Sequence, residues 1–323
     1  MTYPNPFIEE RADPFVTKGQ DGYYYFTASY PAYKKAQNGY DRIILRRSET
    51  VSGLRTAKEH TIWKAHEKGN MAVHIWAPEM HFIGGKYYIF FAAGDRDEVW
   101  HIRPYMLVCA GDDPINDEWL ELGRVKPSQG DERSFGDFSL DMTHFEHKGE
   151  HYLIWAEKNS DSVLMMGKID PSEPNKLISL PILLTKPEYD WEIVRHRVNE
   201  GPSVLKTEDK IIVFFSASGT GEEYCMGMLW ADAENDLMDI SSWHKSDKPV
   251  LSTCDLNGEA GPGHNSFITD ENGKLLIVYH ARPSSHLEKK CGSYFEESLY
   301  DPCRHARIRE IEFREDGLPK IKV

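Results

Sequence analysis

The sequence predicts an all-β protein built as a five-bladed β-propeller, because it combines an internal repeat, hairpin turn chemistry and little helical periodicity. Five segments share one pattern, in which a short apolar stretch, a polar turn and a β-prone run follow a polar or aromatic residue. Their turns align on Gly22, Gly85, Gly149, Asp209 and Gly273, with gaps of 63, 64, 60 and 64 residues. This even spacing favours five similar blades over a β-sandwich or a β-helix.

Each unit is expected to contain a β-hairpin, because Gly, Asn and Asp tolerate positive φ between two β-prone runs. The hairpin segments are ADPFVTKGQDGYYYFTAS, WAPEMHFIGGKYYIFFAA, LDMTHFEHKGEHYLIWAE, NEGPSVLKTEDKIIVFFSAS and GHNSFITDENGKLLIVYHA. Further strand-like pieces follow at 42–46, 105–109, 163–168 and 226–230, and the alternating residues 307–313 are expected to complete the last blade. No linker divides the chain, so residues 1–323 are expected to form a single domain.

The composition describes a folded protein and excludes several kinds of partner. Apolar residues make up 40% of the 323, which is enough for a sizeable core. A net charge of −14 argues against nucleic acid and anionic membrane surfaces, and the sequence has no apolar run of about 18 residues that would predict a membrane span.

The N-terminal residues and the cysteines predict a cytoplasmic protein with reduced thiols. The N-terminus lacks the basic start and apolar stretch of a secretory signal. The five cysteines are widely spaced and form no CxxC motif. Cys291 and Cys303 would be able to pair if the chain were exported.

One position in every unit, nine residues before the turn marker, gathers side chains that can do chemistry. These positions hold Asp13, Trp76, Leu140 with Asp141 beside it, Glu200 and His264. The first strand of each propeller blade lines the central channel, so equivalent positions in different blades converge near the axis. We therefore expect these side chains to meet at one end of the channel.

The three acids suit general acid–base chemistry on a glycosidic bond. Glycoside hydrolysis needs a carboxylic acid that protonates the leaving oxygen and a second carboxylate that acts on the sugar carbon or on water. Asp141 lies between two apolar residues, Leu140 and Met142. A partly apolar pocket would also raise the pKa of the Glu200 carboxyl group, which would then keep a proton near neutral pH. A third carboxylate keeps the pKa of the acid high, because like charges disfavour joint ionisation.

Four more residues are candidates for binding substrate or an ion. Trp76 offers either a flat face for a sugar ring or a side chain for the core. His264, with glycines nearby, is either a hydrogen-bonded structural residue or part of a water or cation site. Arg307 opens the last alternating run and Arg282 follows the run 278–280, so either can reach the pocket or form a surface salt bridge.

The sequence closely resembles the family 43 glycoside hydrolases over nearly its whole length. Asp13 in ADP, Asp141 in SLDMTHF and Glu200 in NEGPSV carry the resemblance, together with the blocks WAPEM, GPGHNSF and RHARI. The resemblance implies a five-bladed propeller that hydrolyses arabinose- or xylose-containing glycans with inversion.

The resemblance also implies a role for individual residues. Asp13 would be the general base, Glu200 the general acid, and Asp141 the residue that tunes the pKa of the acid and orients it. His264 would lie at the axis on a water-coordinated calcium or sodium ion, no cofactor being required for the reaction. Arg307 would contact the sugar or Asp141.

Within the family, SLDMTHF, RVNEGPSVL and RHARI are most similar to α-L-arabinofuranosidases, including exo-acting enzymes on 1,5-linked arabinan. The expected substrates are arabinose-containing oligosaccharides, and the expected process is arabinan degradation. A β-D-xylosidase or an arabinoxylan-directed arabinofuranosidase of the same fold is the alternative, and a sugar-binding propeller is the non-enzymatic one. The insert 286–303 has no counterpart in these motifs.

Overall fold

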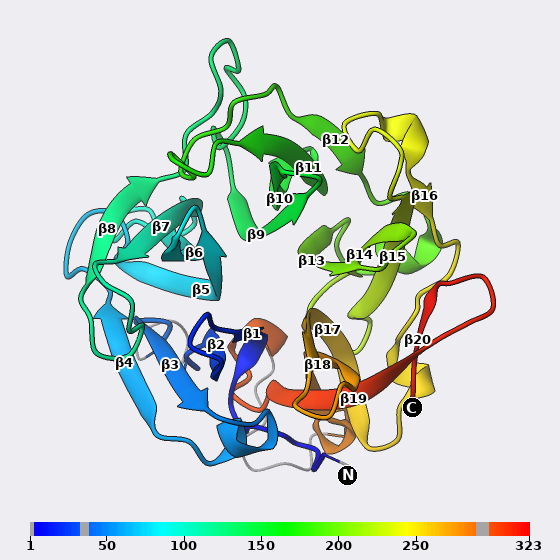
Figure 1. The fold of residues 1–323 in the computed structure, drawn as a ribbon. Helices are drawn as coiled ribbons and strands as arrows, with labels where there is room; N and C mark the ends of the chain where they lie inside the picture. The colour runs from blue at the N-terminus through cyan, green and yellow to red at the C-terminus, as the bar shows by residue number, and fades with distance from the viewer. Residues whose placement is uncertain (1–2, 33–38, 289–296) are drawn as a thin grey trace.

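The computed structural model describes residues 3–32, 39–288 and 297–323, and every element below belongs to these ranges. Its strands form five four-stranded sheets, each made of consecutive antiparallel strands. The sheets stand around a common centre like the blades of a propeller (Figure 1). The predicted all-β, five-bladed β-propeller is therefore confirmed.

The strands are named in chain order. Blade 1 contains β1 (Ala12–Lys18), β2 (Tyr24–Ser29), β3 (Arg42–Ser48) and β4 (Glu59–Lys64). Blade 2 contains β5 (Val73–Ile83), β6 (Lys86–Gly94), β7 (Arg103–Cys109) and β8 (Trp119–Arg124). Blade 3 contains β9 (Ser139–His147), β10 (Glu150–Asn159), β11 (Asp161–Ile169) and β12 (Ile182–Thr185). Blade 4 contains β13 (Asn199–Lys206), β14 (Lys210–Ala217), β15 (Cys225–Asp232) and β16 (His244–Lys245), and blade 5 contains β17 (Glu259–Thr269), β18 (Leu275–Pro283), β19 (His305–Phe313) and β20 (Pro319–Ile321).

The helices of the described ranges are short 3-10 turns in the connections. They are η1 (Ser52–Arg55), η2 (Asp190–Glu192), η3 (Ile240–Ser242), η4 (Thr253–Asp255), η5 (Ser284–His286) and η6 (Ser298–Tyr300). Within these ranges, none of them has the length and apolar character that crossing a bilayer requires.

The strand pieces predicted from the sequence lie where they were expected. The four pieces at 42–46, 105–109, 163–168 and 226–230 fall within the third strands of blades 1 to 4. The alternating run 307–313 lies in β19, but the outermost strand of the last blade is β20. The predicted free thiols are present at Cys109, Cys225 and Cys254, whereas Cys291 lies outside the described residues, and its pairing with Cys303 stays a prediction.

Apolar side chains fill the space between neighbouring blades. In one such cluster, Tyr25 and Ile43 of blade 1 pack together with Ile89 and Phe91 of blade 2. Aromatic and branched residues suit this position, because side chains alternate across a strand and both faces of every blade meet another sheet. The core is therefore a ring of inter-blade layers around the axis.

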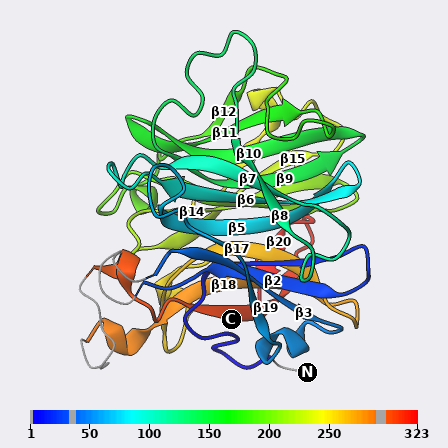
Figure 2. The same ribbon diagram turned by 90° about the vertical axis from the view of Figure 1, so that its left-hand side faces the viewer.

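The ring closes where the first and last blades meet. In the side view, β2 and β18 lie together in the lower part of the molecule (Figure 2), and β1 contacts both β17 and β18. The N-terminal segment adds hydrogen bonds across this junction: Phe7 N–H donates to Ala306 O at 2.8 Å, and Ala306 N–H donates to Ile8 O at 2.9 Å. Because the two ends hold each other, we propose that the chain forms one domain.

The innermost strand of every blade is interrupted by a β-bulge at the same place. The pairing register shifts there in β1, β5, β9, β13 and β17. One residue of each bulge has positive φ: Asp13 (53°), Ala77 (46°), Asp141 (54°), Gly201 (54°) and His264 (43°). The position nine residues before the turn marker coincides with this positive-φ residue in blades 1 and 5. In blades 2, 3 and 4 it lies one residue before it.

The bulges are held by hydrogen bonds from one blade to the next. Ala77 N–H donates to Ser29 Oγ at 2.9 Å, and His264 N–H donates to Ser216 Oγ at 2.7 Å. In both cases the acceptor lies on the second strand of the preceding blade. A left-handed backbone costs about 1–3 kcal/mol for a residue other than glycine, so these contacts are needed to keep it.

Candidate active site

The five bulges surround one end of the central channel, where a cavity of about 950 Å³ opens. Asp13, Trp76, Asp141, Glu200 and His264 all line this cavity. The structure therefore brings together the three acids, the tryptophan and the histidine that the repeat singled out. Their chemical roles are inferred from the contacts described next.

Asp13 lies on β1 with its carboxylate enclosed by donors and positive charge. Ser29 Oγ–H donates to Asp13 Oδ2 at 2.5 Å, while His264 Nδ1 and Arg304 Nη1 lie 3.5 Å and 3.6 Å from Asp13 Oδ1. Burial acts to raise the pKa of Asp13, but the charges of His264 and Arg304 outweigh it and lower the pKa well below its usual range. Asp13 is consequently an ionised carboxylate at neutral pH.

A histidine of the preceding blade fixes the backbone of Asp13. His280 Nδ1 accepts a hydrogen bond from Asp13 N–H at 3.1 Å. Burial lowers the pKa of His280 to about 4, so its ring is neutral and Nδ1 is free of a proton to accept this bond. The ring also stacks on Tyr224, with centroids 5.6 Å apart.

Asp141 and Glu200 form a second group whose protonation is coupled. Asp141 Oδ2 accepts a hydrogen bond from Gly201 N–H at 3.0 Å, which ties it to the residue next to Glu200. Burial raises the pKa of Asp141 to about 8, with the charges of Glu200 and Asp13 adding to the rise. Burial also raises the pKa of Glu200, although Tyr224 O–H donates to Glu200 Oε1 at 2.7 Å. The two groups titrate as a pair that keeps a proton at neutral pH.

The cavity thus contains an ionised carboxylate and a proton-carrying carboxyl pair. Asp13 belongs to blade 1, whereas Asp141 and Glu200 belong to blades 3 and 4. His264 separates the two groups and favours ionisation of Asp13. A base and an acid are therefore available at the same pH on different sides of one cavity.

Aromatic side chains form one wall of the cavity. The His74 ring lies between Trp76 and Trp100, with centroid distances of 4.4 Å and 4.9 Å. Trp76 is almost fully buried, yet its Nε1–H has no hydrogen-bond partner among the described residues. Trp100 is 51% exposed and lines the cavity mouth. This wall offers flat apolar surface to a ligand.

Arg304 is a cavity residue that sequence reasoning missed. Its guanidinium lies beside Asp13 and donates from Nη2 to Tyr40 O–H at 2.9 Å. It opens the same block, RHARI, from which Arg307 was chosen as a substrate-binding candidate. The sequence therefore indicated that an arginine of this block reaches the cavity, but not which of its two arginines does so.

The two predicted arginines have other partners. Arg307 Nε donates to Ala281 O at 3.1 Å, and its Nη1 lies 3.5 Å from Glu259. Arg282 Nη1 donates to Asp301 Oδ2 at 3.3 Å. Neither arginine is one of the described residues that line the cavity. Their role in substrate binding stays a prediction.

The surroundings of His264 do not build a chelating site for a cation. Its Nδ1 faces Asp13 and Asp141, at 3.5 Å and 3.8 Å. In the described part of the chain, no set of three clustered side-chain ligand atoms includes His264. Calcium requires six to eight oxygen ligands, so these side chains alone do not fit it. An axial calcium or sodium ion stays a prediction.

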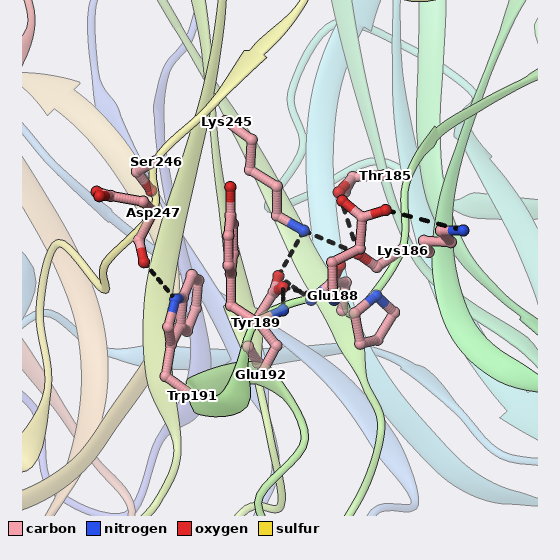
Figure 3. A network of polar contacts seen from close by, with 12 residues as sticks. Thr185, Lys186, Glu188, Tyr189, Trp191, Glu192, Lys245, Ser246 and Asp247 are labelled. Carbon is pink, nitrogen blue, oxygen red and sulfur yellow. Dashed lines mark hydrogen bonds and ion pairs between the residues drawn. The ribbon is translucent and has the colours of Figure 1, made fainter.

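A buried ion pair between Glu192 and Lys245 contacts the segment that leads to Glu200. Sequence reasoning also missed this pair. Figure 3 shows Lys245 pointing toward Glu192, whose carboxylate lies 2.7 Å from Lys245 Nζ. Glu192 is fully buried and also accepts from Tyr189 N–H and from Asn199 Nδ2, at 2.9 Å and 3.0 Å. Asn199 immediately precedes Glu200, so this pair positions the start of β13.

Replacing Lys245 by methionine should lower the free energy of unfolding by about 3–5 kcal/mol, because it leaves the Glu192 carboxylate buried without its cation. The matched control is Lys210→Met, whose partner Asp232 is 62% exposed and whose ion pair is worth about 0–1 kcal/mol. Urea unfolding followed by tryptophan fluorescence measures both losses. Equal, small losses in the two variants would contradict the structural role of Lys245.

Comparison with known proteins adds the family to this geometry. An extracellular exo-α-(1→5)-L-arabinofuranosidase of Streptomyces avermitilis is 40% identical over 100% of this chain and 64% of its own length. The protein of the same name from Streptomyces chartreusis is 45% identical over 87% of this chain and 82% of its own length. This chain therefore spans less than two thirds of the first relative.

A solved structure supports the same relationship. The crystal structure of α-L-arabinofuranosidase from Lactobacillus brevis matches with a TM-score of 0.86 and 39% identity, over 98% of this chain and 95% of that one. The sequence model of glycosyl hydrolases family 43 matches residues 3–319. The resemblance drawn from the motifs is thereby confirmed: the chain belongs to glycosyl hydrolases family 43.

Proposed function

We propose that this chain is an inverting glycoside hydrolase that releases terminal α-L-arabinofuranose from arabinose-containing oligosaccharides, with exo action on 1,5-links. The observation that carries the proposal is the separation of charge states in one cavity: Asp13 ionised, and the Asp141–Glu200 pair protonated. Relatives named exo-α-(1→5)-L-arabinofuranosidases support the choice of sugar and linkage.

In the proposed reaction, Asp13 removes a proton from a water molecule, whose oxygen attacks the anomeric carbon of the terminal sugar. Glu200 gives its proton to the glycosidic oxygen as the bond to the anomeric carbon breaks. Asp141 stays beside this acid and keeps its pKa high. Through the 3.0 Å bond with Gly201 N–H, Asp141 also orients the backbone that carries Glu200. Proton transfer is complete when Asp13 is protonated and Glu200 is ionised.

The terminal sugar is proposed to lie against the aromatic wall. Trp76 lines the cavity and offers its ring to the sugar. Arg304 also lines the cavity, beside Asp13, and has donors for a sugar hydroxyl. A β-D-xylosidase or an arabinoxylan-directed enzyme would need a different fit in this cavity, and a panel of aryl glycosides distinguishes them.

The cellular location predicted from the sequence gains no support. The two Streptomyces relatives are named extracellular, in contrast to the predicted cytoplasmic location. The proposed reaction uses water and carboxyl groups only, so it requires no cofactor.

Glu200→Gln and Asp13→Asn should each lower kcat/KM on arabino-oligosaccharides by about 10²–10⁴-fold, because each removes one proton-transfer partner. On an aryl α-L-arabinofuranoside with a good leaving group, Glu200→Gln should lose much less, since that leaving group needs little protonation. Asp13→Asn should lose equally on both substrates. Glu146→Gln, an exposed acid on the same strand as Asp141, is the control. Near-normal rates on arabino-oligosaccharides in either active-site variant, or preference of the unaltered chain for an aryl β-D-xyloside, would contradict the proposal.

The pH profile of kcat/KM should fall above about pH 8, where the Asp141–Glu200 pair loses its last proton, since burial raises the pKa of Asp141 to about 8. Tyr224→Phe should shift this alkaline limb to higher pH, because the Tyr224 hydrogen bond lowers the pKa of Glu200 against the effect of burial. Initial rates across the pH range measure both. An unmoved limb, or one moved to lower pH, would show that Glu200 does not supply the proton.

A further inference from the structure

A second cavity, of about 910 Å³, lies on blade 3 beside the active-site cavity. The two share a boundary made of two chain segments. Phe138 and Ser162 line the active-site cavity, whereas their near neighbours Asp137 and Asn159 line the second one. Lys158 N–H donates to Phe138 O at 2.9 Å and joins the two segments. We call this second cavity the blade 3 groove; it continues the active site outward.

The inner wall of the groove, residues 131–136, is held in place by hydrogen bonds with three side chains. Arg103 Nη2 donates to Gly136 O at 2.6 Å, and Arg124 Nη2 donates to Phe135 O at 2.8 Å. Glu157, itself 8% exposed, accepts from Phe135 N–H at 3.2 Å. A wall fixed in this way loses little conformational entropy when a ligand binds, so the groove is preorganised.

The lining of the groove suits a carbohydrate chain. Leu180 and Leu183 are 63% and 41% exposed and offer apolar surface to the C–H faces of sugar rings. Lys158, Asn159 and Asp137 provide donors and acceptors for hydroxyls along the other side. Large aliphatic side chains beside polar ones in a concave site are typical of small-ligand binding.

The proposed reaction places the leaving group on this side of the molecule. Asp141 and Glu200 belong to blades 3 and 4, whereas the base Asp13 belongs to blade 1. The acid contacts the oxygen of the bond that breaks, and the base acts on the opposite face of the sugar. The part of the substrate beyond the cleaved bond therefore leaves the cavity past Asp141 and Glu200. The blade 3 groove begins on the blade 3 side of this exit, at Asp137 and Asn159, and continues along the side of blade 3 that faces blade 2.

We propose that the blade 3 groove binds the leaving-group side of linear 1,5-linked arabino-oligosaccharides, two or more units beyond the cleaved bond. This inference rests on the proposed function. It makes the chain selective for longer oligosaccharides over disaccharides and aryl glycosides. Leu180 is a specificity-determining residue in this arrangement, because it adds apolar contact at a distance from the reacting atoms.

The test compares kcat/KM on an aryl α-L-arabinofuranoside, a 1,5-linked disaccharide and a 1,5-linked pentasaccharide. The unaltered chain should favour the pentasaccharide over the disaccharide. Leu180→Ala should lower kcat/KM on the pentasaccharide by about 3- to 10-fold, as expected for part of an aliphatic side chain, and leave the other two substrates unchanged. Lys158→Ala should act in the same direction, because it removes a hydroxyl partner.

Ile178→Ala is the matched control, because Ile178 is 59% exposed near the same edge of blade 3 but is absent from the described lining of the groove. It should behave like the unaltered chain on all three substrates. Equal kcat/KM on disaccharide and pentasaccharide, or an unchanged kcat/KM on the pentasaccharide in Leu180→Ala, would show that the groove does not bind substrate. Either result would leave the proposed function intact. Failure of the unaltered chain to hydrolyse the aryl arabinofuranoside would overturn both.

Discussion

The active site depends on the left-handed bulge at the inner strand of every blade. A regular strand would alternate its side chains between the two faces of its own sheet, and the acids would point into the inter-blade core. The bulge turns the chain at Asp13, Asp141 and His264 so that their side chains face the channel. The backbone N–H of the bulge residue is then out of register with the partner strand of its own hairpin. It donates a hydrogen bond to a side chain of the neighbouring blade instead, as Ala77 N–H does to Ser29. Blade-to-blade packing and active-site geometry are therefore one constraint.

The same constraint produces the electrostatics. Asp141 accepts the N–H of the next bulge, at Gly201, so a proposed catalytic carboxyl is also a link in the ring. His264 lies 3.5 Å from Asp13 and 3.8 Å from Asp141, and the Arg304 guanidinium lies 3.6 Å from Asp13. The pKa of Asp13 consequently falls while burial raises the pKa values of Asp141 and Glu200. Three similar side chains acquire two different protonation states from their neighbours alone.

The repeat predicted the fold and most of the cavity, because turns and inner strands recur at a fixed period. The residue that carries the bulge was displaced by one in blades 2, 3 and 4. The hairpins of blades 2 and 3 turn through two residues, after Ile83 and His147, whereas those of blades 1 and 5 use longer loops, so a constant offset cannot fit all of them. Arg304 and the Glu192–Lys245 pair were missed for another reason. Their partners are distant in the chain, and no periodic pattern marks a residue chosen for a single long-range contact.

In the proposed reaction, Asp13 activates water on one face of the sugar while Glu200 protonates the leaving oxygen on the other. The most direct measurement follows the anomer of the first-formed sugar by proton NMR during hydrolysis of an aryl α-L-arabinofuranoside. We expect β-L-arabinofuranose to appear first and then to equilibrate with the α anomer, because one displacement inverts the anomeric carbon. Initial release of the α anomer would show two displacements through a covalent intermediate, and would contradict the assignment of Asp13 as a base.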